Sequence, residues 1–213
     1  GLSASRALAV SLAALLHDAD DRKYFKDTPA GEYPNARREM EKAGVDAQVV
    51  ADALQMIGWV SCSTHGNSIP PAAAEEPELL WPRWADRLEA TGEIGVVRCW
   101  QYAVETQSKF SLASTPKPSN EAELWELATP ERFAKYQESK GSSDSMMDHY
   151  YDKLLRVAMP PMECIRNPYL ETKMKEQVAP LVEVCFRFSQ GGEAAALELI
   201  REMAERCERE SAE

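Results

Sequence analysis

The sequence predicts an all-α protein, and three observations support that class. Nearly every periodic segment repeats its apolar residues at helical spacing, no segment alternates as a half-buried strand does, and helix caps recur along the chain. With 213 residues, the chain is expected to form a single-domain bundle of about eight or nine helices over residues 1–213. A chain of this length buries about 70% of its unfolded surface, so no disulfide or metal staple is needed for folding.

The N-terminal helices are predicted from their caps and apolar faces. Ser3 or Ser5 caps a first helix, whose leucines between residues 8 and 16 form one apolar face, so we expect a core helix. Asn35 is expected to cap a short polar helix. Asp46 then opens the next helix, which is apolar over most of its length.

The later helices follow from the same signals. A long helix is expected from about Trp84 to Gln107, with close packing accounting for its two glycines. Thr129 caps a helix that has Pro at its first position, and Asp144 caps another that runs to Met159. Two C-terminal helices are expected at residues 168–189 and 193–210, divided by a pair of glycines.

Composition and charge exclude several classes of function. Thirty-five acidic residues against 24 Lys and Arg give a net charge of -11, which disfavours binding to duplex nucleic acid or to an anionic membrane. No apolar run reaches the roughly 18–20 residues of a membrane span. The five cysteines form no Cys-x-x-Cys pair, which is typical of free thiols in a reducing compartment, so we expect a cytoplasmic protein.

The first candidate site runs from His17 to Lys23, where the apolar face of the first helix gives way to acidic residues. His17 and Asp18 are adjacent in sequence, and near a helix end both side chains can reach one cation. Asp20 and Asp21 add negative charge that requires a cation or a lysine partner. A helix end with a solvated acidic turn is an equally open interpretation.

Two later segments place charged residues on expected helices. Asp86 lies at the start of a helix that we expect to be buried, where a carboxylate requires a cation or several donors. The alternative for Asp86 is a helix N-terminal carboxylate stabilised by the macrodipole. His149, Lys153 and Arg156 share one helix face and form a cationic stripe that suits an oxyanion or a phosphate. The alternative for this stripe is a solvated face whose cations pair with acids elsewhere.

In this order the three segments resemble the HD-domain metal-dependent phosphohydrolases, and more narrowly their small bacterial-type branch. Leu-Leu-His-Asp-x-x-Asp-x-Lys spans residues 15–23, Asp-Arg-Leu-x-Ala-x-Gly-x-Ile-Gly spans 86–95, and His-(Phe/Tyr)-Tyr-x-Lys-Leu-Leu spans 149–155. Three ordered motifs are far more specific than one His-Asp pair. The resemblance covers about residues 5–190 and implies an all-α fold.

The resemblance implies a role for each matching residue. His17, Asp18 and Asp86 match metal ligands, and one imidazole with two carboxylates suits a single Mn²⁺, Mg²⁺ or Fe²⁺ ion. Asp21 matches the acidic residue that positions or deprotonates the attacking water, and Lys23 belongs with it in the catalytic set.

The substrate implied by the resemblance is a small phosphorylated metabolite, with a nucleotide expected first. A metal-activated water would release pyrophosphate or phosphate from it. By resemblance, four residues would face the substrate phosphates: Lys23, Arg98, His149 and Lys153. Arg156, the third member of the cationic stripe, is also expected to bind the substrate. His65 lies in a polar loop and could contact the nucleotide, with a solvated loop histidine as the alternative.

The sequence departs from the family at the first metal ligand, a histidine on a helix that precedes the His-Asp pair. No histidine precedes His17, and the chain opens without Met almost directly into a helix. We therefore expect a helix upstream of residue 1 to supply that ligand. The alternative is a catalytically degraded HD fold that serves as a ligand-binding or protein-interaction module. A homodimer, and closure of residues 66–82 and 111–143 over the site, are also open.

Overall fold

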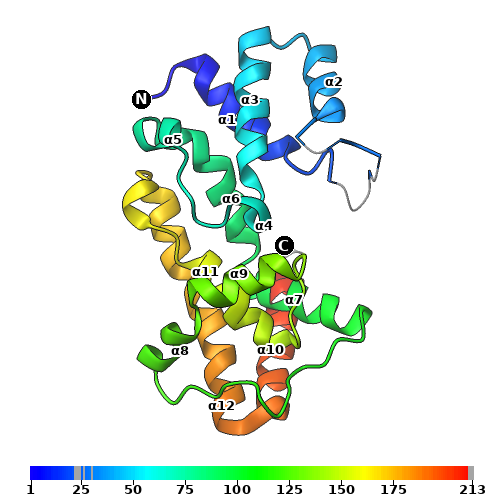
Figure 1. The fold of residues 1–213 in the computed structure, drawn as a ribbon, viewed down its shortest axis with the longest axis vertical. Helices are drawn as coiled ribbons and strands as arrows, with labels where there is room; N and C mark the ends of the chain where they lie inside the picture. The colour runs from blue at the N-terminus through cyan, green and yellow to red at the C-terminus, as the bar shows by residue number, and fades with distance from the viewer. Residues whose placement is uncertain (22–24, 26, 30, 211–213) are drawn as a thin grey trace. The chain divides into compact units, whose positions relative to one another are not determined.

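The computed structural model describes residues 1–21, 25, 27–29 and 31–210, and its regular structure within them is entirely helical (Figure 1). The prediction of an all-α fold is therefore confirmed. Backbone contacts divide the chain into two compact units. Unit 1 is Gly1–Asp86 with Glu163–Leu170, and unit 2 is Arg87–Met162 with Glu171–Glu213. The union of the two units into one domain stays a prediction.

Unit 1 is built around the pair α1 and α3, which make the most extensive helix contact in the molecule and lie side by side in Figure 1. Its helical segments are α1 (Ala4–Leu16), α2 (Pro34–Lys42), α3 (Ala47–Val60), α4 (Cys62–His65), α5 (Pro71–Glu75), η1 (Pro77–Leu80) and the greater part of α6 (Trp81–Glu89). Among the described residues, no helix combines the length and the apolar character needed to cross a membrane.

The face that α1 buries is not the face predicted from its leucines. Ala9 and Ala13 are fully buried, whereas Leu8 and Leu15 are 46% and 80% exposed. Alanines let two helix backbones approach closely, which suits the contact of α1 with α3. Leu12 and Leu16 are half-buried, so the expectation of a leucine-packed core helix was wrong for Leu8 and Leu15.

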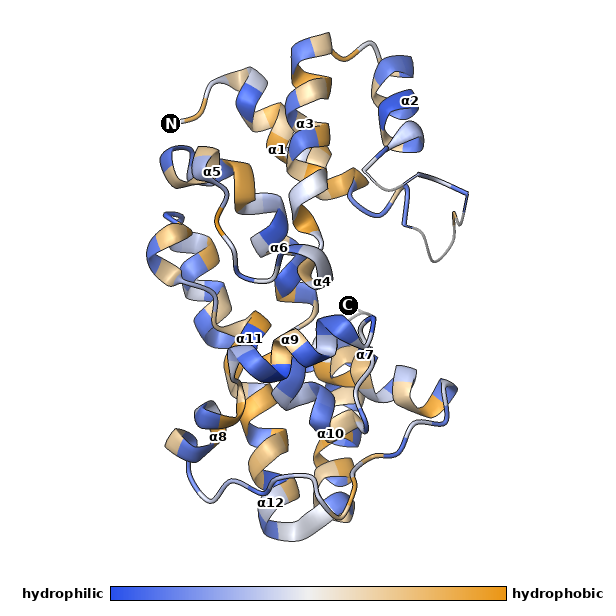
Figure 2. Cartoon of the chain, viewed as in Figure 1, coloured by the Kyte–Doolittle hydropathy of each residue, from blue (hydrophilic) through white to orange (hydrophobic). Residues whose placement is uncertain are grey.

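The N-terminal caps in unit 1 follow the sequence at two positions out of three. The side chain of Ser3 accepts a hydrogen bond from the backbone N–H of Arg6, and Asp46 accepts one from Gln48, as predicted. Asn35 does not cap α2. It lies inside that helix, which is mostly hydrophilic in Figure 2. The backbone N–H groups of the first turn of α2 donate instead to Asp20.

Unit 2 packs its helices around a core of aliphatic and aromatic side chains. Its segments are the end of α6, then α7 (Gly92–Glu105), α8 (Glu121–Leu127), α9 (Pro130–Glu138), α10 (Met146–His149), η2 (Tyr150–Leu154), α11 (Leu155–Ala158) and, from Glu171 onward, α12 (Pro168–Glu210). The short segment η3 (Met162–Cys164) begins in unit 2 and ends in unit 1. Fully buried members of the core include Val96, Leu124, Tyr150, Leu155, Leu181 and Val184.

The long helix expected from Trp84 to Gln107 is broken into α6 and α7. Gly92 has a φ of 69°, a left-handed conformation that favours glycine. A Cβ on Gly92 would lie 1.5 Å from Oε1 of Gln177, and one on Gly95 would lie 2.4 Å from the backbone of Ala90. Close packing at both glycines was predicted correctly, but at Gly92 it accompanies a helix break.

The third motif lies on a helix that changes its winding. α10, η2 and α11 follow one another without interruption, and η2 is a turn of π-helix. The helix begins one residue later than predicted, because Ser145 rather than Asp144 provides the cap. The connection between α7 and α8 is fastened to this helix, since Tyr151 donates a hydrogen bond to the carbonyl of Pro116. Further along, α12 is interrupted at Gly192, which separates the two C-terminal helices as expected.

Candidate functional site

His17 ends α1 and is held there by one of its ring nitrogens. Its Nδ1 lies 2.8 Å from the carbonyl oxygen of Ala14. A carbonyl oxygen can only accept a hydrogen bond, so Nδ1 carries the proton and donates it. Nε2 is therefore the nitrogen that faces other groups. A histidine that binds a metal commonly fixes its ring in this way, by donating from the nitrogen opposite the ligating one.

Two carboxylates lie beside Nε2 of His17. Oδ1 of Asp86 is 3.2 Å away and Oδ2 of Asp18 is 3.5 Å away. The hydrogen bond with Asp86 is the main reason that the pKa of His17 rises from 6.5 to about 9, with burial opposing the rise and the Ala14 carbonyl and Asp18 adding to it. Without a metal, a positive charge on the imidazole balances the two acids.

The donor set suits a divalent cation in chemistry and in pairwise spacing. Two ligand atoms that occupy neighbouring positions around a small divalent ion are about 3 Å apart, close to the separations from Nε2 of His17. In the described part of the chain, no three His, Cys, Asp or Glu residues are already arranged around a common ion position. To bring all three side chains around one ion, the side chain of Asp18 must rotate. It is 76% exposed and has room to do so.

Asp86 lies in the second half of α6, not at the start of a helix as predicted, so stabilisation by a helix N-terminus does not explain it. The helix around it is firmly seated within unit 1. The side chain of Arg83 donates to the carbonyls of Trp59 and Ser68 at 2.6 and 2.7 Å, and Trp81 donates to that of Ile165. These bonds fix α6 against the end of α3 and so hold Asp86 towards His17.

The other residues of the acidic turn have different surroundings. Asp20 is 6% exposed, and its carboxylate is engaged by the first turn of α2. Asp21 is partly buried, and its backbone N–H donates to the carbonyl of Asp18 at 3.1 Å. Lys23, predicted to act beside Asp21, lies outside the described residues.

His65 makes a backbone contact within unit 1. It ends α4, and its Nε2 donates to the carbonyl of Gly58 at 2.8 Å. Gly58 belongs to the last turn of α3, whose carbonyls have no partner within the helix. A histidine that caps such a carbonyl has a structural role, so the expected nucleotide contact rests only on its remaining ring nitrogen.

The cations predicted to face phosphate in unit 2 lie in two places. Arg98 is exposed on α7 and pairs with Glu89 at 3.2 Å. Lys153 and Arg156 lie over aromatic rings of α9, with Lys153 Nζ 5.9 Å from the centre of the Tyr136 ring and Arg156 Cζ 5.5 Å from that of Phe133. No carboxylate of the described residues is within ion-pair distance of Lys153.

His149 lies beside the same aromatic cluster. Its ring centre is 5.4 Å from that of Tyr136, and its Nδ1 is 3.4 Å from the hydroxyl of Ser143. Burial, with a smaller contribution from the positive charge of Lys153, lowers the pKa of His149 to about 3. His149 is therefore neutral at neutral pH. It offers a phosphate a hydrogen bond and no charge.

Sequence reasoning missed a charge network beside this stripe. Arg132 on α9 binds Asp152 at 2.7 Å and Asp148 at 3.1 Å, and Thr115 and Ser145 donate to the second oxygen of Asp148. The two acids thus have partners of their own. Their i, i+4 spacing was a signal for a shared cation, but the position of Arg132 in sequence gave no indication that it lies opposite them.

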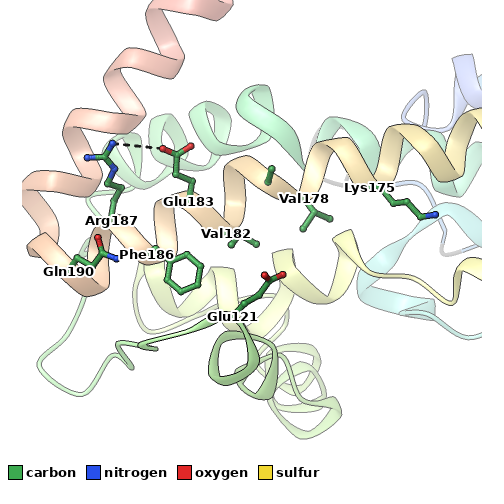
Figure 3. A pocket seen from close by; sticks show the side chains of 9 residues that line it. Glu121, Lys175, Val178, Val182, Glu183, Phe186, Arg187 and Gln190 are labelled. Atoms are coloured by element: carbon green, nitrogen blue, oxygen red, sulfur yellow. Dashed lines mark ion pairs between the residues drawn. The ribbon is translucent and has the colours of Figure 1, made fainter.

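Unit 2 also has an open groove of about 610 Å³ along α12, shown in Figure 3. Val178, Val182 and Phe186 form its apolar floor, and Glu183 and Arg187 pair at its edge at 3.9 Å. No residue predicted to act in catalysis or binding lines it.

The comparisons with known proteins identify a relative but no activity. No family model matches the sequence. Uncharacterized protein L803 of Acanthamoeba polyphaga mimivirus is 34% identical over 199 residues, which cover 88% of this chain and 79% of that protein. A crystal structure of a Lactobacillus plantarum protein, a structural genomics target, aligns with a TM-score of 0.44 and 16% identity over 88% of this chain and 97% of that one. The resemblance to HD-domain phosphohydrolases stays a prediction.

Proposed function

We propose that this chain, which belongs to the same family as uncharacterized protein L803 of Acanthamoeba polyphaga mimivirus, is a metal-dependent phosphohydrolase that acts on a small phosphorylated metabolite. A nucleotide is the expected substrate. One observation carries the proposal. Nε2 of His17 faces the carboxylates of Asp18 and Asp86, while its Nδ1 is fixed on the Ala14 carbonyl. The order of the three HD-like motifs adds to it.

In this proposal His17, Asp18 and Asp86 hold one Mn²⁺, Mg²⁺ or Fe²⁺ ion. Such an ion, when bound, polarises a phosphoryl oxygen and lowers the pKa of a bound water. The carbonyl of Ala14 keeps the imidazole in the tautomer that presents Nε2. Asp21, three residues beyond Asp18, is assigned to orient the attacking water and to accept its proton.

Phosphate binding in unit 2 is assigned first to Lys153 and Arg156. Lys153 lies over the Tyr136 ring and has no carboxylate of the described residues within ion-pair distance, so its charge is available to an anion. Arg98 already has Glu89 as a partner and would have to exchange it for a phosphate. His149 contributes a hydrogen bond in its neutral form.

The test is release of phosphate or pyrophosphate from a nucleotide panel with and without Mn²⁺, using the native full-length protein. Asp86→Ala is expected to lose the metal-dependent turnover. Glu89→Ala is the matched control, because it removes an exposed carboxylate from the same helix. It is expected to keep the metal-dependent turnover, or to raise it by freeing Arg98. Unchanged turnover in Asp86→Ala contradicts the assignment of that ligand.

A second candidate function is a catalytically degraded HD fold that binds a ligand or a partner protein. It is favoured by the open arrangement of the acids, since no closed three-ligand set is found in the described residues. Silence across the panel, with no metal bound to the purified protein, supports this module. Silence with a metal bound points instead to an active site that was offered the wrong substrates.

A further inference from the structure

Asp20 caps a helix to which it does not belong. Its Oδ1 accepts the backbone N–H of Asn35 at 3.0 Å, and its Oδ2 accepts that of Ala36 at 2.9 Å. Both amides are in the first turn of α2, where N–H groups lack partners within the helix. Tyr33, the residue at the N-cap position, provides no side-chain bond. The carboxylate of Asp20 therefore takes the role of the cap from outside the helix.

A third hydrogen bond runs in the opposite direction. Nδ2 of Asn35 donates to the carbonyl of Ala19 at 3.2 Å, so the backbone next to Asp20 is bound as well as its side chain. The helix that receives these bonds is itself anchored. Ala36 and Met40 of α2 are no more than 1% exposed, and α2 packs on α3. The acidic turn is thus fastened to a helix that is itself anchored on α3 by two buried side chains.

This attachment acts on the backbone that carries the candidate ligand and the candidate base. Asp18 and Asp21 flank the fastened pair, and two backbone bonds close the turn, from Ala19 to the carbonyl of Leu16 and from Asp21 to that of Asp18. The side chain of Asp18 has little packing of its own, because 76% of it is exposed. Its direction therefore depends on how firmly the turn beneath it is held.

We propose that Asp20 and Asn35 form a positioning clamp, whose hydrogen bonds to the first turn of α2 and to the Ala19 carbonyl set the directions of Asp18 and Asp21. Neither clamp residue contacts the ion or the substrate. The inference rests on the proposed function, because it assigns the clamp to that same site. The site then depends on the packing of α2 against α3.

The clamp is tested by measuring the Kd for Mn²⁺ of the full chain by titration of the free-Mn²⁺ EPR signal. Asp20→Ala is expected to raise this Kd by about 10- to 100-fold, the usual cost of losing a group that orients a metal ligand. Asp46→Ala is the matched control, because Asp46 caps α3 in the same unit and lies outside the acidic turn. It is expected to change the Kd by less than about twofold despite a similar loss of a cap. Equal changes in the two variants overturn the clamp.

A metal-free readout separates failure of the clamp from failure of the proposed function. Amide hydrogen exchange at Ala19 and Asp21 is expected to accelerate by about tenfold or more in Asp20→Ala and to stay unchanged in Asp46→Ala. If the wild type binds no Mn²⁺, the proposed function fails, and unchanged exchange at both amides then overturns the clamp as well. Should Asp20→Ala not fold, Asn35→Ala removes only the bond to Ala19, and a Kd equal to that of the wild type overturns the proposal.

Discussion

His17 in unit 1 and His149 in unit 2 are both partly buried, and their surroundings shift their pKa values in opposite directions. Asp86 and Asp18 face His17 and favour its charged form, so its pKa rises to about 9. His149 lies beside the Tyr136 ring, and burial, with a smaller contribution from the charge of Lys153, lowers its pKa to about 3. The first environment attracts a cation, whereas the second offers its positive charge to an anion.

The difference between the two histidines depends on which acids are already paired. Asp148 precedes His149 in sequence, as Asp18 follows His17, but both oxygens of Asp148 are engaged by Arg132, Thr115 and Ser145. Asp18 has no such partners among the described residues apart from His17. A histidine next to an aspartate therefore indicates a cation site only where the acid is not satisfied by the surrounding fold.

The largest effect is expected from removing His17. His17→Gln should raise the Kd for Mn²⁺ by more than about 100-fold, since losing even an indirect orienting group costs 10- to 100-fold. His149→Gln should leave that Kd within about twofold, because no acid of the described residues faces its ring. Isothermal titration of both variants with Mn²⁺ checks the pair. Equal losses of Mn²⁺ affinity in the two variants would contradict the distinction between the two histidines.

A second effect is expected from Arg132, which balances two acids of unit 2. Arg132→Ala should lower the free energy of unfolding by about 2–3 kcal/mol, because Asp148 and Asp152 are mostly buried and lose their common cation. Arg187→Ala, which breaks the exposed pair with Glu183, should cost less than about 0.5 kcal/mol. Urea denaturation of the two variants measures the difference. Similar costs would mean that the network is as weak as a surface pair.

The third effect concerns pH. The pKa of His149 is about 3 in the folded chain and 6.5 in the unfolded one, so the unfolded chain binds more protons between these values. Stability from this group is thus fully present above pH 6.5 and is lost as the pH falls towards 3, by at most about 1.4 kcal/mol per pH unit. His149→Gln should show a shallower decline of unfolding free energy over this window. Parallel curves for the two proteins would show that His149 is not held neutral.

Features set by neighbouring residues were predictable from the sequence. The caps at Ser3, Asp46 and Thr129 were correct, because a cap bonds within three residues of itself. The His-Asp pair at residues 17 and 18 was also recognisable, since both members are adjacent in the chain. The role of Asp86 is a proposal, but its approach to His17 follows the order of the motifs.

Features that depend on distant partners were not predictable. Asp20 bonds to residues 15 and 16 positions away, and nothing in its local sequence distinguishes it from a solvated acid. The periodicity of α1 identified a helix, but not that Leu8 and Leu15 would be exposed. The close packing that excludes a side chain at Gly92 comes from Gln177 on α12. In each case the deciding contact comes from another helix, and one sequence does not reveal that pairing.

The smallest effect is expected at His65, the third histidine, whose recorded ring contact in the described part of the chain is the carbonyl of Gly58. His65→Ala removes one hydrogen bond to the Gly58 carbonyl, which should cost about 0.5–1.5 kcal/mol of unfolding free energy. Turnover of the best nucleotide substrate should change by less than about twofold, because the bond caps α3 and does not support Asp86 directly. His65→Gln, whose amide can donate to the same carbonyl, should recover part of the lost stability. A large rise in KM with stability unchanged would instead support the nucleotide contact and give this chain a third kind of histidine site.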